Sequence, residues 1–261
     1  MERVFITGAS SGLGAAFAAR YAARGAMLGL VARRGDVLHA LVNGLPHAAR
    51  HRIYALDVND HAALAAAAAD FIAAAQGIDV VIAAAGISRG TLTECAEDLP
   101  AFARILATNV TATVATFTPF IDAMRAEART GNRRCRLVGI ASVAGIRGLP
   151  GAGAYSASKA AIISYCEALR LELKRSGIRV VTIAPGYIDT PMTWVNDYPM
   201  PFLMPAEKFA QKAVAAIDVG VSYRVIPWQM GVVAKLLRVL PNGLYDRLFV
   251  DAPRKARDID A

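Results

Sequence analysis

A glycine-rich turn near the start of the chain separates a short apolar run from an alanine-rich segment. The apolar run covers residues 4–7, the turn reads Gly8-Ala9-Ser10-Ser11-Gly12-Leu13-Gly14, and the alanine-rich segment continues to about Arg24. A buried strand that enters a helix through such a turn is typical of a parallel α/β sheet. The glycines let the backbone approach a pyrophosphate, and the helix start offers free N–H groups to it. Taken alone, the turn is also compatible with an ordinary strand–helix connection.

Segments typical of strands and helices alternate along the rest of the chain. The further strands are expected at residues 26–32, 52–56, 79–84, 136–141, 179–184 and 224–227. The helices between them are expected at residues 37–43, 62–75, 100–129 with a bend near Pro119, and 155–175. This alternation predicts an α/β fold, a doubly wound parallel sheet of Rossmann type with about seven strands and helices on both faces.

The 261 residues suit one large domain followed by a helical extension. We expect the main domain over residues 1–227, with a lid at about 191–209, and the extension over residues 228–261. Pro241-Asn242-Gly243 divides this extension into two short helices that combine apolar and basic residues. Packing against the same domain or a partner subunit is the favoured interpretation, and peripheral contact with a membrane surface is the alternative.

The composition argues against several classes of protein. A hydrophobic fraction of 55% with only 19% charged residues argues against disorder, and there is no apolar run of ~18 residues to span a bilayer. The net charge of +8 comes from clustered arginines without interleaved aromatics, so no nucleic-acid partner is expected. Three scattered cysteines and four histidines lack metal-ligand spacing, so no metal site is expected. Reduced thiols and the absence of a leader segment favour a cytoplasmic protein.

Tyr155 and Lys159 stand four residues apart in a predicted helix, so their side chains share one helix face. A nearby ammonium group favours the phenolate and is expected to lower the tyrosine pKa from ~10 towards neutrality. A phenol tuned in this way donates a proton to a developing alkoxide, or accepts one from an alcohol, near physiological pH. Hydride transfer to or from a carbonyl needs such a group.

Several separated motifs accompany this pair in a fixed order. They are the glycine-rich turn, Asp57-Val58, Asn109, Ser142, Tyr155-x-x-x-Lys159 and Pro185-Gly186-Tyr187-Ile188-Asp189-Thr190. In order and spacing, residues 3–190 resemble the classical short-chain dehydrogenase/reductase (SDR) family. One motif departs from the family pattern, because residues 83–86 read Ala-Ala-Ala-Gly where the family commonly has asparagine. We expect this departure to reduce rigidity without abolishing cofactor binding.

The resemblance implies a role for each catalytic residue. Tyr155 would be the general acid/base, and Lys159 would lower its pKa and bind the nicotinamide ribose. Ser142 would hydrogen-bond the substrate oxygen, and Asn109 would hold a water that links Lys159 to solvent. Without the resemblance, Ser142 is equally a turn cap and Asn109 an interruption of a helix.

The resemblance also implies a nicotinamide dinucleotide site assembled from the separated motifs. Asp57 would contact the adenine, and the segment 185–190 would meet the nicotinamide carboxamide. The residues expected to bind the cofactor are Gly8, Ser10, Ser11, Gly12, Leu13, Gly14, Arg33, Arg34, Asp57, Val58, Gly86, Tyr155, Lys159, Pro185, Gly186, Ile188 and Thr190.

The end of the second predicted strand indicates which dinucleotide binds. Ala32 stands where an NAD-selective site has a carboxylate for the ribose 2′-hydroxyl, and Arg33 and Arg34 follow. A guanidinium forms paired, charge-assisted hydrogen bonds with a 2′-phosphate. The pattern favours NADP(H) over NAD(H), with Arg33 as the principal contact. A solvated arginine pair at a strand exit is the alternative.

The expected activity is NADP(H)-dependent reduction of a ketone or aldehyde to an alcohol. Methionines and aromatics in the lid favour a hydrophobic substrate, although they equally suit packing of the lid on the domain. The alternatives are oxidation of a hydrophobic secondary alcohol by the same residues, and a non-catalytic NADP-binding or membrane-associated sensor. The resemblance further implies a homodimer or homotetramer.

Overall fold

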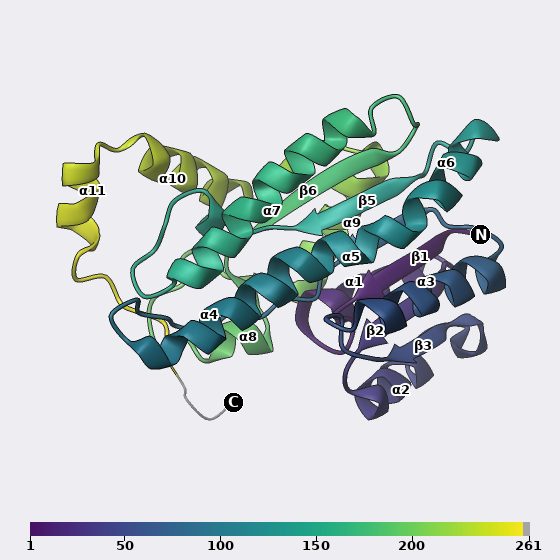
Figure 1. The fold of residues 1–261 in the computed structure, drawn as a ribbon, viewed down its shortest axis with the longest axis horizontal. Coiled ribbons are helices and arrows are strands. Elements are labelled where there is room, and N and C mark those ends of the chain that lie inside the picture. Colours follow the sequence, from purple (N-terminus) through teal and green to yellow (C-terminus); the bar gives the residue numbers. More distant parts are fainter. Residues whose placement is uncertain (258–261) are drawn as a thin grey trace.

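A seven-stranded parallel sheet forms the centre of the computed structural model, which describes residues 1–257 (Figure 1). Neighbouring strands pair in parallel in the order β3-β2-β1-β4-β5-β6-β9. The strands are β1 (Arg3–Thr7), β2 (Met27–Ala32), β3 (Arg52–Ala55), β4 (Val80–Ala83), β5 (Arg136–Ile140), β6 (Arg179–Pro185) and β9 (Tyr223–Ile226). The predicted fold class is confirmed.

Helices cover both faces of the sheet. One face carries α1 (Gly12–Ala22), α2 (Gly35–Asn43) and α9 (Ala206–Val219), and the other carries α3 (His61–Ala75), α4 (Leu99–Leu106), α5 (Ala112–Phe117), α6 (Ile121–Arg129) and α7 (Gly153–Glu172). Successive strand residues point to opposite faces, so each face has its own apolar core. On one face Phe17 packs edge to face against Phe209, and on the other Phe5 packs against Phe71 and Phe120.

The segment predicted as one bent helix over residues 100–129 is divided into shorter pieces. A π-helical segment, Ala107–Thr111, separates α4 from α5, and a 3₁₀ turn, Thr118–Phe120, separates α5 from α6. Pro119 accounts for the second break, because proline cannot donate the helical hydrogen bond. The π-helical segment contains Asn109, and π turns interrupt α-helices frequently at functional sites.

Helix α9 (Ala206–Val219) begins within the segment that the sequence predicts as the end of the lid. The lid was expected to reach residue 209, but α9 begins at Ala206, and the lid ends at β8 (Met204–Pro205), which pairs with β7 (Ile188–Asp189). The lid itself contains one short helix, α8 (Pro191–Trp194). The buried residues Phe209, Ala213 and Ile217 recur at helical spacing. That periodicity is the signal by which the sequence identifies α9.

The strand order places the functional edge of the sheet. β1 and β4 are neighbours in the sheet, and the strand order reverses between them: β2 and β3 follow on the side of β1, whereas β5, β6 and β9 follow on the side of β4. In open parallel sheets, ligands bind outside the carboxyl ends of the strands at such a reversal. The loops that leave β1 and β4, which carry the glycine-rich turn and Gly86, meet at this point.

The C-terminal extension consists of α10 (Trp228–Val239) and α11 (Asn242–Phe249), so the predicted helices are present. Gly231 lies against Val225 of β9, and the Tyr245 hydroxyl donates to the carbonyl of Gly148. The Arg147 guanidinium lies 4.2 Å from the centre of the Tyr245 ring. One side of the extension thus packs on the main domain. Residues 258–261 of the predicted extension lie outside the described residues, and its boundary at residue 227 stays a prediction.

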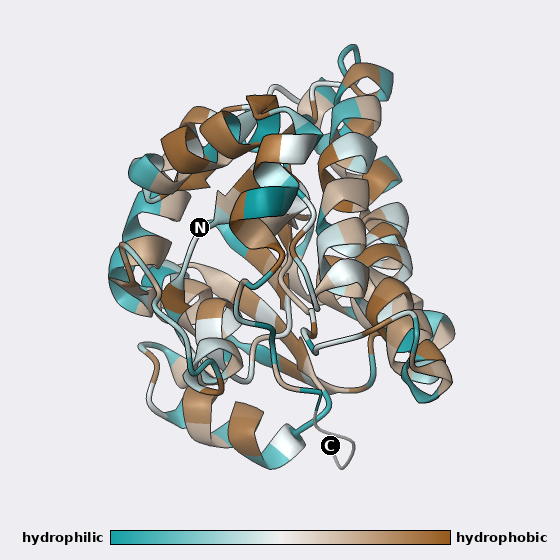
Figure 2. Ribbon diagram, turned by 90° about the vertical axis from the view of Figure 1, so that its left-hand side faces the viewer, coloured by the Kyte–Doolittle hydropathy of each residue, from teal (hydrophilic) through white to brown (hydrophobic). Residues whose placement is uncertain are grey.

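The outer side of the extension combines exposed apolar residues with charged ones. Figure 2, which turns the end bearing α10 and α11 towards the viewer, shows hydrophobic and hydrophilic stretches mixed on the helices there. The exposed apolar residues of the extension are Trp228, Val232, Val233, Leu236, Val239, Leu244, Leu248 and Val250. Within residues 1–257, no helix is both long and apolar enough to cross a membrane.

Candidate active site

The glycine-rich turn packs tightly against the end of β4. Gly8 has a φ of +70°, and a Cβ on it would lie 2.7 Å from the Cα of Ala85. A Cβ on Gly14 would collide with the carbonyl oxygen of Gly8. Both positions therefore require glycine. The resulting close turn at the start of α1 is a cradle that suits a pyrophosphate.

Residues 185–190 lie beside this turn. A Cβ on Gly12 would lie 3.4 Å from the side chain of Thr190. Thr190 is buried and caps α8 through reciprocal hydrogen bonds with Thr193. The N–H of Gly186 donates a hydrogen bond to the carbonyl of Ile226 at 2.8 Å. The structure thus brings together two motifs that are separated by most of the chain.

The arginines after β2 approach the turn unequally. The Arg34 guanidinium donates to the Ser10 hydroxyl at 3.1 Å, and both arginines are exposed. This contact distinguishes Arg34 from Arg33, which the sequence favoured. At the end of β3, Asp57 is exposed and accepts hydrogen bonds from the backbone and side-chain amides of Asn59. These groups lie along one edge, where an adenosine moiety would extend from the turn.

Asn109 connects the loop after β4 to α7. Its Oδ1 accepts from the N–H of Ile87 at 2.8 Å, and its Nδ2 donates to the carbonyl of Ile87 and to the hydroxyl of Ser158. Both amide hydrogens are therefore engaged, and the side chain is buried. The side chain has a structural task in this arrangement, and its expected role in holding a water stays a prediction.

Gly86 lies close to the side chains of both Asn109 and Lys159. A Cβ on Gly86 would lie 3.2 Å from Oδ1 of Asn109 and 3.5 Å from Nζ of Lys159. The absence of a side chain keeps the space in front of the lysine open. The dinucleotide motifs and the proposed catalytic residues therefore adjoin each other.

Ser142 follows β5 and begins a short 3₁₀ turn. Its hydroxyl oxygen accepts from the N–H of Ala144 at 3.1 Å. Ser142 therefore caps this turn, which is the alternative to a catalytic role that the sequence offered. The same hydroxyl hydrogen-bonds the Tyr155 phenol, which favours the phenolate and opposes the effect of burial on the pKa. Ser142 combines the two interpretations, because a hydroxyl both accepts and donates.

Tyr155 and Lys159 share one face of α7, as their spacing predicts. Lys159 Nζ lies 5.6 Å from the centre of the Tyr155 ring and donates to the carbonyl of Ile140 at 2.9 Å. Burial lowers the pKa of Lys159 to about 8. Burial also raises the pKa of Tyr155, against the hydrogen bond from Ser142.

The expected lowering of the Tyr155 pKa by Lys159 is not what this arrangement gives. The ammonium group faces the ring and the Ile140 carbonyl, and the desolvation of the phenol outweighs the favourable contact with Ser142. A charge helps an anion most when the two groups are adjacent and the site remains polar. In this structure the protonated phenol is favoured.

Tyr198 of the predicted lid lies near Tyr155 and packs against Tyr187. The rings of Tyr187 and Tyr198 meet edge to face with centres 6.4 Å apart. Burial raises the pKa of Tyr198 to about 12, and Tyr155 contributes to this rise. From the sequence, Tyr198 is predicted only as part of the lid surface. No local pattern indicates that it lies near Tyr155, since the two residues come from different elements.

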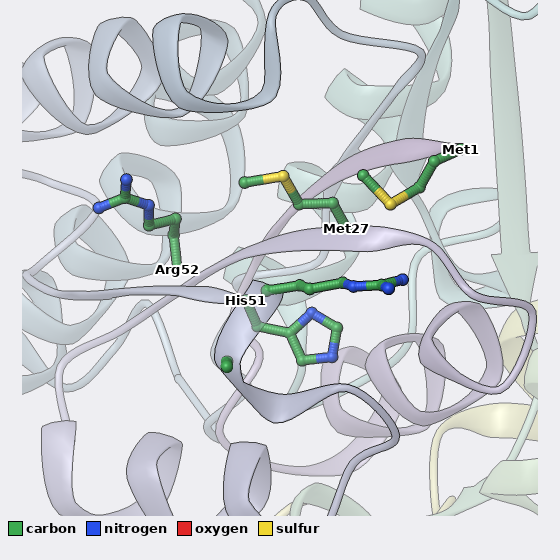
Figure 3. Close-up of a pocket in the computed structure, with 6 residues that line it drawn as sticks. Met1, Met27, His51 and Arg52 are labelled. Atoms are coloured by element: carbon green, nitrogen blue, oxygen red, sulfur yellow. The ribbon is translucent and has the colours of Figure 1, made fainter.

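Other chemically notable residues lie away from this site. The hollow in Figure 3 is lined by Met1, Met27 and residues 49–52, at the amino ends of β2 and β3. Burial raises the thiol pKa of both Cys135 and Cys166 to about 11, which opposes a nucleophilic role and agrees with the predicted packing role of Cys166. Residues 1–257 contain no cluster of histidine, cysteine, aspartate or glutamate suited to a metal ion.

The sequence is similar to that of known oxidoreductases over most of its length. Residues 2–198 match the family model described as short chain dehydrogenase. An uncharacterized oxidoreductase of Myxococcus xanthus is 38% identical over 247 residues, which cover 92% of this chain and 93% of that protein. A 2-dehydro-3-deoxy-L-rhamnonate dehydrogenase (NAD(+)) of a Sphingomonas species is 36% identical and is matched over 72% of both chains.

Solved structures share the fold at lower sequence identity. A 3-ketoacyl-(acyl-carrier-protein) reductase from Brucella melitensis, complexed with NADH, superposes with a TM-score of 0.79. It is 24% identical, and the match covers 86% of this chain and 96% of that one. This likeness concerns the architecture alone.

Proposed function

Because the chain belongs to the short-chain dehydrogenase family, whose members are oxidoreductases, we propose that it reduces a ketone or aldehyde to an alcohol with NADPH. The observation that carries the proposal is the convergence of Ser142, Tyr155 and Lys159 beside a glycine turn that suits a dinucleotide. The Ser142 hydroxyl meets the Tyr155 phenol, and Gly86 leaves the space before Lys159 open.

The residues around the turn fit a nicotinamide dinucleotide. The close turn at Gly8 and Gly14 supports a pyrophosphate site, and the proximity of Thr190 to Gly12 supports its assignment to the nicotinamide end. A nicotinamide dinucleotide bound in this site supplies the hydride for the reduction. The protein residues then have to orient the carbonyl, exclude water and deliver a proton.

Proton delivery falls to Tyr155. Its raised pKa keeps the phenol protonated at neutral pH, which suits proton donation to the oxygen of a carbonyl under reduction. The Ser142 hydroxyl is positioned to hydrogen-bond the same oxygen as negative charge develops on it. Lys159, with a pKa of about 8, is suited to restoring the proton to the phenol.

NADP(H) is proposed over NAD(H) from the end of β2. Ala32 provides no carboxylate, and Arg33 and Arg34 follow it, with Arg34 already held at the turn by Ser10. Two guanidinium groups beside the adenosine ribose suit a 2′-phosphate. The Sphingomonas relative is an NAD(+) dehydrogenase by name, and the Brucella structure is a complex with NADH, so the assay below compares both coenzymes.

A hydrophobic substrate is proposed from the lid. Tyr198 lies near Tyr155 and packs against Tyr187, and the exposed apolar lid residues are Met192, Trp194, Val195, Phe202 and Leu203. Oxidation of a hydrophobic secondary alcohol remains the second candidate, because the same residues serve both directions. A non-catalytic sensor would gain nothing from a serine, tyrosine and lysine arranged in this way.

The proposal also covers the oligomeric state of the protein and its cellular compartment. We expect a cytoplasmic homodimer or homotetramer, since family members are commonly oligomeric and the cysteines at positions 95, 135 and 166 are free. Size-exclusion chromatography with light scattering measures the assembly directly.

The decisive experiment follows coenzyme oxidation over a series of ketones and aldehydes of increasing apolar size, with NADPH and NADH in parallel. Tyr155→Phe should lower kcat by about 10²–10⁴-fold and weaken NADPH binding far less, because it keeps the ring and removes the hydroxyl that donates the proton. Tyr165→Phe is the matched control on the same helix, where the ring stacks on Phe117. Full turnover by Tyr155→Phe would refute the proposed mechanism.

Coenzyme preference is tested in the same assay. Arg33→Ala and Arg34→Ala should each raise the KM for NADPH by about 10-fold or more and leave the KM for NADH nearly unchanged, because each removes a charged contact to the 2′-phosphate. Equal use of NADH and NADPH by the unaltered protein would contradict the coenzyme proposal and leave the mechanism standing.

A further inference from the structure

The last described part of the chain returns from α11 to the loops that surround Tyr155. We call residues 250–257 the strap. In Figure 1 its yellow ribbon runs from α11 towards α4 and α8. The carbonyl of Ala256 accepts from the N–H of Gly90 at 2.9 Å, and Lys255 Nζ donates to the carbonyl of Met192 at 3.2 Å. The strap thus joins the loop after β4 to the lid after β6.

The strap also crosses the loop between β5 and α7. A Cβ on Gly151 would lie 2.8 Å from the Cβ of Arg254, and a Cβ on Gly90 would collide with the carbonyl oxygen of Lys255. Both loops have glycine where the strap passes, and any larger residue would displace it. The fit indicates a contact built into both loops.

The surface under the strap directly adjoins the catalytic tyrosine. Thr91 forms an isolated parallel bridge with Ala152, and its hydroxyl accepts from the N–H of Ala154 at 3.4 Å. Tyr155 is the next residue along α7. The strap therefore lies over the two loops that meet at the start of α7, next to Tyr155 in the chain.

An ion-pair cluster fastens the far end of the strap. Arg257 Nε donates to Oδ2 of Asp98 at 2.8 Å, and its Nη2 donates to Oε1 of Glu97 at 3.0 Å. Oδ2 of Asp98 also accepts from the N–H of Leu92 at 2.8 Å, and the side chain is buried. We call Arg257, Glu97 and Asp98 the clasp. The hydrogen bond from Arg257 lowers the pKa of Asp98, so the carboxylate stays charged at neutral pH.

We propose that the strap forms the outer wall of the substrate site and that the clasp determines how large a carbonyl substrate reaches Tyr155. With the clasp closed, the strap holds three loops at fixed separation, and only compact substrates pass beneath it. Bulky substrates require the strap to open, so they lose catalytic efficiency in proportion to the stability of the clasp. This inference rests on the proposed function for its substrate but on geometry alone for the strap.

Arg257→Ala in the full-length chain tests the strap without any need for turnover. Hydrogen exchange of the Gly90 amide, which donates to Ala256, should become about 5- to 10-fold faster, because the strap opens more often without its clasp. Arg257→Lys, which keeps one charge but loses the paired hydrogen bonds, should fall between Arg257→Ala and the unaltered chain. Arg125→Ala is the matched control, since Arg125 makes an ion pair with Asp122 on α6, away from the strap. Unchanged exchange at Gly90 in Arg257→Ala would refute the claim that the clasp holds the strap closed.

Substrate size tests the wall. For Arg257→Ala, the ratio of kcat/KM for the bulkiest ketone to that for the smallest should rise about 5- to 10-fold, in step with the exchange rate. A faster Gly90 exchange without a change in this ratio would show that the strap does not bound the substrate site. Should the unaltered chain reduce no carbonyl, the proposed function fails, and binding of the same ketones to the NADPH complex, followed by NADPH fluorescence, gives the size ratio instead. An unchanged size ratio in that binding measurement would likewise refute the claim that the strap forms the outer wall of the substrate site.

Discussion

At Lys159 the proposed chemistry conflicts with stability. The side chain is 6% exposed, donates one hydrogen bond to the Ile140 carbonyl and has its pKa lowered to about 8. A lysine whose folded pKa lies below its unfolded value of 10.5 destabilises the fold while both states are protonated. Residues at active sites commonly carry such a penalty, because function requires a charge where packing would favour an apolar group.

Lys159→Met should therefore raise the free energy of unfolding while it abolishes turnover. At pH 7 we expect a gain of about 1–3 kcal/mol, less than the full pKa difference because the hydrogen bond to Ile140 is also lost. The gain is fully present below pH 8 and shrinks as the pH rises towards 10.5, where the unfolded lysine also loses its proton. Urea unfolding at pH 7 and pH 9.5 measures it, with exposed Lys208→Met as control. A loss of stability at pH 7 would contradict the prediction.

At the scale of elements, α10 has a buried apolar side and an exposed apolar side. Its buried residues Met230, Gly231 and Ala234 face the domain, whereas Trp228 and Leu236 are 69% and 60% exposed. Exposed basic residues, Lys235 on α10 and Arg247 on α11, accompany the outer side. An apolar helix side with flanking basic charge is typical of contact with an anionic lipid surface. The inner side agrees with the packing that the sequence favoured.

We expect the full-length protein to sediment with vesicles that contain anionic lipid. Leu236→Asp should lower the bound fraction about 10-fold, because it removes an exposed apolar side chain that would enter the lipid and adds a repelled charge. Leu171→Asp, at a residue that is 61% exposed on α7, is the matched control. No sedimentation of the unaltered protein would contradict membrane contact. A dimer in solution that Leu236→Asp dissociates would assign the outer side to a second copy.

At the scale of the whole molecule, ion pairs stabilise the edge of the sheet where β1 and β4 begin, whereas the candidate site lies at the opposite edge, where these strands end. Arg3 pairs with Asp79 at 2.8 Å and with Glu127 at 2.9 Å, and Asn132 donates to Asp79. These bonds connect β1, the start of β4 and α6. Burial opposes ionisation of Asp79, but the hydrogen bonds from Arg3 and Asn132 outweigh it and lower its pKa.

Asp79→Asn should lower the free energy of unfolding by about 2–4 kcal/mol at pH 7, because Arg3 loses its buried partner. A carboxylate with a lowered pKa stabilises the fold above its unfolded pKa of ~4, and this contribution is lost as the pH falls through the folded value. The difference between variant and unaltered chain should therefore shrink at pH 3. Thermal unfolding at both pH values tests this, with Asp122→Asn as control, since that side chain is 94% exposed. A difference that persists at pH 3 would contradict the assigned cause.

The features that the sequence determined are local ones. Alternating apolar runs and helical segments specify a parallel α/β sheet, because each period is a property of neighbouring residues. The glycine-rich turn and the spacing of Tyr155 and Lys159 specify their own geometry in the same way, and the structure realises both. Residues 206–219 carried a helical period as well, and the lid prediction overlooked it at its end.

Tertiary structure alone decided how distant segments meet and what the resulting environment does to charge. The Asp98–Arg257 contact joins residues 159 positions apart, and no local pattern announces it. The raised pKa of Tyr155 likewise depends on burial by other elements, which outweighs the hydrogen bond from Ser142. Desolvation and long-range pairing are properties of the packed interior, whereas periodicity and turn geometry belong to the chain itself.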